Sequence, residues 1–406
     1  MPSALKPTSP GAANKLLGLE ALRFLTAFAI LVYHYRHFGF VADKSVGLVP
    51  ERLPLYGLLQ PFYNSGVFGV WIFWCISGFI FFWKYRDPVA DRSIGGWKFF
   101  VLRFSRLYPL HLATLLLVAL LQPIYFGMHG YFLVYQDNDL PHFLAQLFMA
   151  SDWGIVHGLS FDGPVWSVSI EVLLYFLFFL MLLATRSWLL NVALIVFCLS
   201  TTYLNASAQI MNCLAFFYIG GLAAIARQAV ASVKFRFAIE GVAWFAVVVG
   251  PFVVVSLARD QLDRFDFPLL LAYTPILLFC LSREITVPAG VQKAVEAAGN
   301  MTYSSYLLHF PIQLMTAIGF SIVGAAIPLY DVRFFAIYLV ITLLASYLTY
   351  RYFEAPAQNF VREFFLRPNV AAPSWASPSS YSQGYDRLVC RQKFAEDVRG
   401  PRDHVS

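Results

Sequence analysis

The sequence predicts an all-α, polytopic membrane protein with about ten transmembrane helices and both termini in the cytoplasm. The first observation is the composition, because 59% of the 406 residues are hydrophobic and only 13% are charged. A typical soluble domain carries about 25% charged residues. The second observation is a series of apolar segments, each long enough to cross about 30 Å of hydrocarbon. The third is an alternation of basic and non-basic loops, which predicts the orientation of the spans.

The apolar segments define the expected elements in chain order. We expect spans at residues 17–37, 66–84, 99–123, 165–184, 188–204, 208–226, 239–257, 267–282, 302–324 and 334–354. The polar segment 1–15 lacks the short apolar core and the cleavage pattern of a signal peptide, so we expect the first span to be a retained anchor. Residues 16–360 then form one transmembrane domain. Residues 361–406, rich in Pro and Ser, are expected to form a disordered cytoplasmic tail.

Basic residues predict which loops face the cytoplasm. The loop after the second expected span and the start of the third span carry Lys84, Arg86, Arg92, Lys98, Arg103 and Arg106. The stretch from Leu107 to Thr185 has no Lys or Arg, so the loop at 124–164 is expected outside. The net charge of +6 follows from this topology and does not require nucleic acid as a partner.

Two polar residues stand out in the first expected span. Arg23 and His34 are eleven residues apart, which places them on one face of a helix, about 16 Å apart along its axis. One interpretation is a polar cavity inside the bundle, because an Arg at the centre of a span costs on the order of 3 kcal/mol. The other is an Arg that reaches the near interface and a His satisfied by a carbonyl.

The second and third expected spans contribute a hydroxyl and two guanidiniums. Ser77 lies in a segment that also carries Gly66, Gly69 and Gly78, which is typical of closely packed helices. Arg103 and Arg106 are three residues apart and share a helix face. They form either a binding site for phosphate or an ordinary pair of basic residues that anchors the helix at the cytoplasmic surface of the membrane. With Arg23 they would suit a donor with an anionic head and a long reactive arm, and acyl-CoA is such a molecule.

Six motifs in order resemble those of the acyltransferase-3 family of integral-membrane acyltransferases, which includes O-acetyltransferases of bacterial surface polysaccharides. They are Arg23 with His34, the glycine-rich GVWIFWCISGF, the pair Arg103 and Arg106, WSVSIEVLLY with Trp166, Ser167, Glu171 and Tyr175, TYSSYLLHFPI with Tyr306 and His309, and RYFEAP with Glu354. The chain departs from the family pattern at Trp71, Val172 and Leu173, where many members carry polar residues.

The resemblance implies transfer of an acyl group, with acetyl favoured, from cytoplasmic acyl-CoA to a hydroxyl of an envelope or extracytoplasmic carbohydrate. It implies the stand-alone form without an SGNH-type esterase domain, placed in the lipid bilayer of a bacterial inner membrane. No permanently bound cofactor and no metal site are expected; acyl-CoA acts as a substrate.

The residues then receive expected roles. His34 is the expected catalytic group, either as the general base for the acceptor hydroxyl or as a carrier of the acyl group. Glu171 would orient that imidazole or bind sugar hydroxyls, unless it is an interfacial acid facing water. Donor binding is expected from Arg23, Arg103, Arg106, Ser77 and His309. Acceptor-side or structural roles are expected for Trp166, Ser167, Tyr175, Tyr306 and Glu354, the last as an ion-pair partner of Arg23 or another basic residue.

Two rival functions use the same residues. A secondary transporter also has many spans and buried Arg, His and Glu, although the two halves of this sequence show no convincing repeat. A haem-binding electron carrier would use two of the histidines His34, His111 and His309 as axial ligands. The acyltransferase interpretation further expects His34 to share one continuous polar passage with the arginines.

Overall fold

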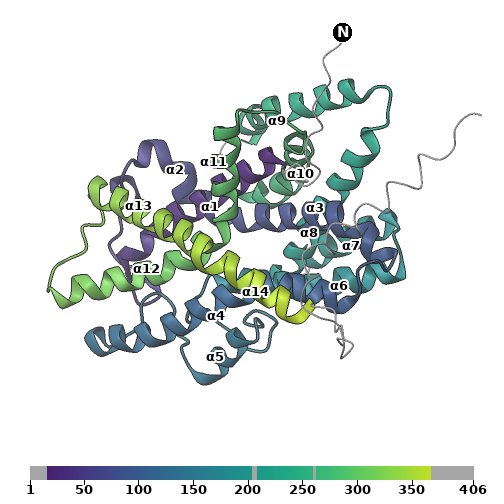
Figure 1. The fold of residues 1–406 in the computed structure, drawn as a ribbon. Helices are drawn as coiled ribbons and strands as arrows, with labels where there is room; N and C mark the ends of the chain where they lie inside the picture. Colours follow the sequence, from purple (N-terminus) through teal and green to yellow (C-terminus); the bar gives the residue numbers. More distant parts are fainter. Residues whose placement is uncertain (1–15, 204–207, 259–261, 367–406) are drawn as a thin grey trace, which may run out of the picture. The chain divides into compact units, whose positions relative to one another are not determined.

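The computed structural model describes residues 16–203, 208–258 and 262–366, and these residues are almost entirely helical (Figure 1). The predicted polar N-terminal segment and most of the predicted tail lie outside the described residues. The first half contains α1 (Leu17–Tyr35), η1 (Arg36–Gly39), β1 (Phe40–Val41), β2 (Lys44–Ser45), η2 (Pro50–Arg52), α2 (Tyr56–Ser65), η3 (Gly66–Phe68), α3 (Gly69–Ala90), α4 (Gly96–His129), α5 (Leu140–Leu147) and α6 (Val165–Ala184). The second half contains α7 (Trp188–Tyr203), α8 (Ala208–Val230), α9 (Arg236–Ala258), α10 (Leu262–Leu281), α11 (Ala289–Asn300), α12 (Thr302–Ile322), α13 (Val332–Thr349), the π-helical turn η5 (Tyr350–Glu354) and α14 (Ala355–Leu366).

Helices long and apolar enough to span a membrane confirm the predicted fold class. Among the described residues there are eight: Leu17–Gly39, Tyr56–Ala90, Gly96–His129, Val165–Ala184, Gln209–Val230, Arg236–Ser256, Thr302–Ile322 and Val332–Leu366. The two other predicted spans correspond to shorter apolar helices, Trp188–Thr201 and Asp266–Leu281. The number of ten spans and the cytoplasmic termini stay predictions.

Several elements were not predicted. A two-stranded antiparallel ribbon, β1 with β2, pairs Phe40 with Ser45 after α1. The second span is longer than predicted because α2, η3 and α3 continue one another from Tyr56 to Ala90. The last span continues through η5 into α14, so the chain remains helical to Leu366, beyond the expected start of the tail at 361. Hydropathy identifies only the part of a helix that faces lipid and does not detect polar extensions.

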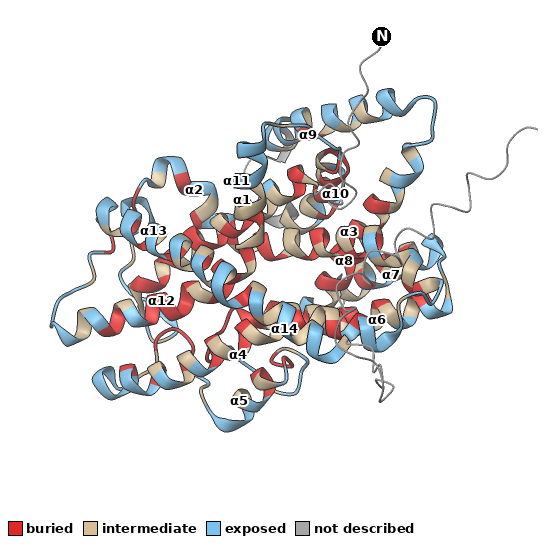
Figure 2. Ribbon diagram, in the orientation of Figure 1, coloured by how far each residue is buried: buried red, intermediate tan, exposed pale blue. Residues whose placement is uncertain are grey.

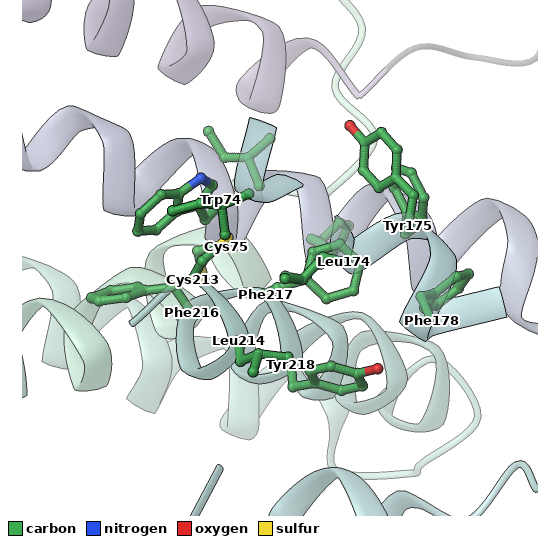
Figure 3. Packing of buried hydrophobic residues seen from close by; sticks show 14 of the residues in the cluster. Trp74, Cys75, Leu174, Tyr175, Phe178, Cys213, Leu214, Phe216, Phe217 and Tyr218 are labelled. Atoms are coloured by element: carbon green, nitrogen blue, oxygen red, sulfur yellow. The ribbon is translucent and has the colours of Figure 1, made fainter. Parts of the chain in front are cut away.

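The core of the bundle is the packing of α3 on α8, with α6 beside them (Figure 3). Trp74 and Cys75 of α3 pack with Phe216 and Phe217 of α8 in one buried cluster. Buried residues follow the inner faces of α1, α3, α8 and α12, whereas the outward faces are exposed (Figure 2). Many exposed residues are large and apolar, as expected for surfaces that lipid covers.

Close approach of α3 and α8 depends on glycines in both helices. A Cβ atom at Gly78 would overlap the backbone carbonyl of Phe217, and one at Gly220 would overlap the carbonyl of Cys75. The glycine-rich composition of the second span thus has a packing explanation. The close packing of α3 on α8 also fixes the position of Ser77, which precedes Gly78 in the sequence.

We expect Gly78→Ala to destabilise the folded protein, because the added methyl has no space and overpacking costs about 1–3 kcal/mol. Thermal unfolding in detergent should show a lowered Tm. Gly319→Ala is the matched control, since Gly319 is also helical and nothing lies within 4 Å of its added Cβ. An equal loss of stability in both variants would contradict the packing explanation.

Candidate active site

A cavity of about 360 Å³ lies between helices from both halves of the chain. Helices α1, α3, α4, α6, α12 and α14 supply most of its wall. Its polar lining residues are Glu20, Arg23, Ser77, Lys84, Tyr85, Arg103, Arg106, Ser167, Glu171, Tyr175, Asn300, Thr302, Tyr303, Tyr306, Gln358 and Arg362. Along α3 the lining extends from Val70 to Tyr85, which corresponds to about 22 Å of helix. The cavity is therefore long and narrow.

Five basic side chains gather at one end of this cavity. They are Arg23, Lys84, Arg103, Arg106 and Arg362. Two of the residues bordering the cavity, Glu20 and Glu171, are acidic. Within the described residues no carboxylate pairs with Lys84, Arg103 or Arg106. A group of cations without matching carboxylates creates a positive potential that attracts an anionic ligand.

Arg23 is held in place by neighbours on two helices. Its guanidinium donates to Glu20 Oε2 over 2.9 Å and to Thr302 Oγ1 over 3.1 Å. Glu354 was expected to pair with Arg23 or another basic residue, but among the described residues it forms no ion pair, and Glu20, one turn earlier on α1, pairs with Arg23 instead. Glu354 is buried in η5 and its Oε2 accepts from Ser304 Oγ over 2.5 Å.

Arg103 is held differently, by aromatic rings of α3. Its guanidinium donates to the Tyr85 hydroxyl over 2.5 Å and lies 4.7 Å from the Tyr85 ring centroid and 5.0 Å from that of Phe81. The aromatic faces favour a cation without neutralising its charge. The Arg103 side chain thus keeps a full positive charge available to a ligand.

Glu171 lies in the same cavity as the arginines. Its Oε1 accepts hydrogen bonds from Ser77 Oγ of α3 and from the Tyr175 hydroxyl, the latter over 2.7 Å. Tyr175 follows Glu171 by one turn of α6 and stacks on Phe81, 4.4 Å between ring centroids. The structure brings Glu171, Ser77 and Tyr175 together and does not place Glu171 against His34.

Hydrogen-bonded side chains close the inner end of the cavity. The Tyr306 hydroxyl of α12 donates to the Pro164 carbonyl over 2.8 Å and lies 2.7 Å from Ser167 Oγ. The Trp74 indole N–H donates to the Ser167 carbonyl over 3.4 Å, and Trp166 packs edge-to-face on Trp74 with the ring centroids 5.7 Å apart. Tyr306 and Ser167 therefore join α6 to α12. We refer to Trp74, Ser167 and Tyr306 as the inner wall of the cavity.

Two histidines face each other beyond this inner wall. The ring centroids of His34 and His309 are 4.8 Å apart, and those of His34 and His37 are also 4.8 Å apart. His34 Nδ1 lies 3.0 Å from the Ile30 carbonyl, and His309 Nδ1 lies 2.7 Å from the Tyr306 carbonyl. Since a carbonyl oxygen only accepts, each Nδ1 carries the hydrogen and each Nε2 keeps its lone pair. Both rings thus present a basic nitrogen.

The histidines do not line the cavity that holds the arginines. His309 follows Tyr306 by one helical turn, and Tyr306 is the last α12 residue of the cavity wall. The expectation of one continuous polar passage is therefore not met in this conformation. The hydrogen bonds of Tyr306 to Pro164 and Ser167 fix its side chain at the boundary of the cavity, between the cavity and His309.

The geometry of the histidines also bears on the haem interpretation. Rings 4.8 Å apart between centroids are in direct contact, so no porphyrin fits between His34 and His309. His111 is buried elsewhere, with Nε2 2.7 Å from the Gln146 carbonyl. In the described part of the chain, no group of three or more His, Cys, Asp or Glu is arranged to hold a metal ion.

The sequence analysis missed eight of the sixteen polar residues that line the cavity, and it also missed the buried His37 and Asp162. His37 lies three residues after His34, a helical spacing that was a usable signal. Lys84 and Arg362 line the cavity, but each resembles an ordinary cytoplasmic anchor in the sequence. Asp162 is fully buried just before α6, and neither carboxylate oxygen has a hydrogen-bond partner among the described residues. The Thr114 hydroxyl beside it donates to the His111 carbonyl instead.

Comparison of the sequence with known protein families gives a match that includes most of these site residues. Residues 16–351 match the acyltransferase-3 family, described as an acyltransferase domain. The chain belongs to the acyltransferase-3 family. The match includes every predicted site residue except Glu354, and it ends before α14.

One curated relative of this acyltransferase-3 member is the acyltransferase MdmB of Streptomyces mycarofaciens. The two sequences are 28% identical over 174 residues, which is 42% of this chain and 40% of that protein. The alignment thus covers less than half of the relative. No solved structure matches the chain. Family membership and the eight long apolar helices identify a multi-pass membrane protein of an acyltransferase family.

We expect Asp162→Asn to change how stability depends on pH. Burial raises the pKa of Asp162 from 3.8 to about 7, so the folded protein holds this proton more tightly than the unfolded chain. The free energy of unfolding contributed by Asp162 therefore falls as the pH rises from about 4 to 7, by on the order of 4 kcal/mol. Asn should abolish this fall and make the variant more stable than wild type at pH 7.

Thermal unfolding in detergent between pH 4 and 8 tests this expectation. Asp43→Asn serves as the control, because Asp43 is exposed and its variant should follow the wild-type profile. A difference between Asp162→Asn and wild type that does not vary with pH would rule out the buried-carboxyl explanation.

Proposed function

We propose that the protein transfers an acyl group, with acetyl favoured, from cytoplasmic acyl-CoA to a hydroxyl of an extracytoplasmic carbohydrate, and that it does so in a bacterial inner membrane. The observation that carries the proposal is the cavity, in which unpaired cations at one end face a hydrogen-bonded wall at the other, with two basic imidazoles directly behind that wall. Family membership supports the reaction class.

The shape and charge of the cavity suit the donor. Acyl-CoA carries phosphates at one end and a thioester at the far end of a slender arm. Arg23, Arg103 and Arg106 would bind the phosphates through charge-assisted hydrogen bonds. The arm would follow α3 past Ser77 and Glu171, and its thioester would reach the wall formed by Trp74 and Tyr306. The remaining step is passage of the acyl group past the Tyr306 ring.

His34 is the proposed catalytic residue. Its free Nε2 would take the proton of the acceptor hydroxyl as that oxygen attacks the thioester carbon, and the CoA thiolate leaves with the electron pair of the C–S bond. In a two-step route, Nε2 attacks the thioester first and the acceptor then resolves the acyl-imidazole. His309, in contact with His34, supplies a second lone pair that accepts a proton from it.

The acceptor would approach from the side opposite the arginines. His34 is only partly buried, and Arg36 lies beside it, with its guanidinium 3.8 Å from the Tyr33 ring centroid. Arg and Tyr groups are suited to hydrogen bonding with sugar hydroxyls. In the proposed reaction the donor and the acceptor would meet at His34 from opposite faces of the membrane, once the acyl group has passed Tyr306.

We expect His34→Ala to lose at least about 10²-fold in acyl transfer, because it removes the basic nitrogen. The measurement is transfer of radiolabel from acetyl-CoA in membranes, with protein amount and detergent monodispersity as checks on folding. His129→Ala is the matched control, since His129 is exposed. Full activity of His34→Ala would remove the catalytic assignment. Solute uptake by purified wild-type protein without acyl-CoA would instead favour the transporter.

We expect the double variant Arg103→Ala, Arg106→Ala to raise the KM for acetyl-CoA by about 100-fold with a smaller change in kcat, because these charges contact the phosphates and not the thioester. Lys98→Ala is the control from the same helix, because Lys98 is exposed and does not line the cavity. An unchanged KM in the double variant would argue against the anion site.

A further inference from the structure

Helix α14 forms part of the cavity wall although it lies beyond the residues that match the family. Gln358 and Arg362 are four residues apart and both line the cavity, so one face of α14 points inward. The opposite face carries the exposed Phe360 and Phe364, which stack on each other. In Figure 1, α14 runs beside α4, the helix that carries Arg103 and Arg106.

Contacts between α14 and α4 fix this face in position. Arg362 Nε donates to Ser105 Oγ of α4 over 3.1 Å. In the last turn of α14, the Phe365 carbonyl accepts the Trp97 indole N–H over 3.2 Å, and the ring centroids of these two residues are 5.8 Å apart. Because Nε is engaged by Ser105, the two terminal nitrogens of the Arg362 guanidinium remain to bind a ligand.

Arg362 is held among other cations. It lines the same cavity as Arg103 and Arg106, and its partner Ser105 lies between these two residues in the sequence of α4. Bringing like charges together at the edge of a membrane protein is unfavourable unless an anion offsets the repulsion. A ligand with a doubly charged phosphate would provide that anion.

The basic residues are arranged at two depths. Arg106 is three residues further into α4 than Arg103, about 4.5 Å along the axis, and it lines the same cavity as Arg23 of α1. Arg362 contacts Ser105, and Phe365, one turn later on α14, contacts Trp97 at the start of α4, so Arg362 lies toward the same end of α4 as Arg103. The cavity therefore has a deeper pair, Arg23 with Arg106, and a shallower pair, Arg103 with Arg362.

CoA carries its anionic groups in a matching order. With the thioester at the inner wall, the diphosphate comes first, and the 3′-phosphate of the ribose comes next toward the open end. We propose that Arg362 of α14, together with Arg103, binds the 3′-phosphate of CoA, while Arg23 and Arg106 bind its diphosphate. This inference rests on the proposed acyl-CoA donor and adds a specificity residue to it.

Binding of CoA and of 3′-dephospho-CoA tests the assignment, since the two ligands differ only in the phosphate in question. The affinity of each is measured by calorimetry for the full chain in nanodiscs of phosphatidylcholine, which contain no anionic lipid to compete. We expect wild type to bind CoA about tenfold more tightly than dephospho-CoA. Arg362→Gln should weaken CoA binding about tenfold and leave dephospho-CoA binding unchanged.

Two further variants make the result specific. Arg106→Gln should weaken both ligands, because both carry the diphosphate. Arg351→Gln, one turn before α14 begins and outside the cavity lining, should change neither. The inference is overturned if Arg362→Gln leaves CoA binding intact or weakens both ligands alike, or if wild type does not distinguish them. Absence of binding of either ligand to wild type would overturn the proposed donor itself.

Discussion

The presence of several unpaired guanidiniums inside a bundle of membrane helices is the constraint on which the rest of this structure depends. A buried charge is tolerated in such a bundle only where it reaches water, a partner or a ligand. Here the cations lie at one end of a long cavity, where Arg103 rests on aromatic rings and Arg23 is paired with Glu20. The surrounding helices are spaced so that these groups share one polar volume.

The spacing of the helices follows from the packing on the far side of α3. Glycines at 78 and 220 let α3 and α8 approach until their backbones are in contact. This close approach fixes one wall of the cavity and leaves the opposite face of α3 to line it. Ser77, next to Gly78, is thereby directed at Glu171. The same helix thus serves both as the centre of the apolar core and as the scaffold of the site.

The inner wall separates the cationic cavity from the cluster of histidines. On one side are the groups suited to an anionic donor, and on the other are the imidazoles His34 and His309. Tyr306 and Ser167 close the boundary with hydrogen bonds between α12 and α6. For the proposed reaction, a closed wall would keep water and the acceptor away from the thioester until the acyl group moves toward His34. In that proposal Tyr306 would have to move for the acyl group to reach His34.

The sequence by itself determined the membrane class, the helical fold and the family, because hydropathy and motif spacing are local properties of the chain. It also singled out half of the polar residues that line the cavity, including Glu171, Ser77 and Tyr306. It could not determine which carboxylate pairs with Arg23, since Glu20 and Glu354 both carry the required charge and only the contacts of Arg23 with Glu20 and with Thr302 of α12 distinguish them. Nor could it show that Arg362 belongs to the site or that Tyr306 separates the arginines from His34. Those features arise from contacts between helices far apart in the chain, where the distance between side chains depends on how the backbones pack and not on their spacing in sequence.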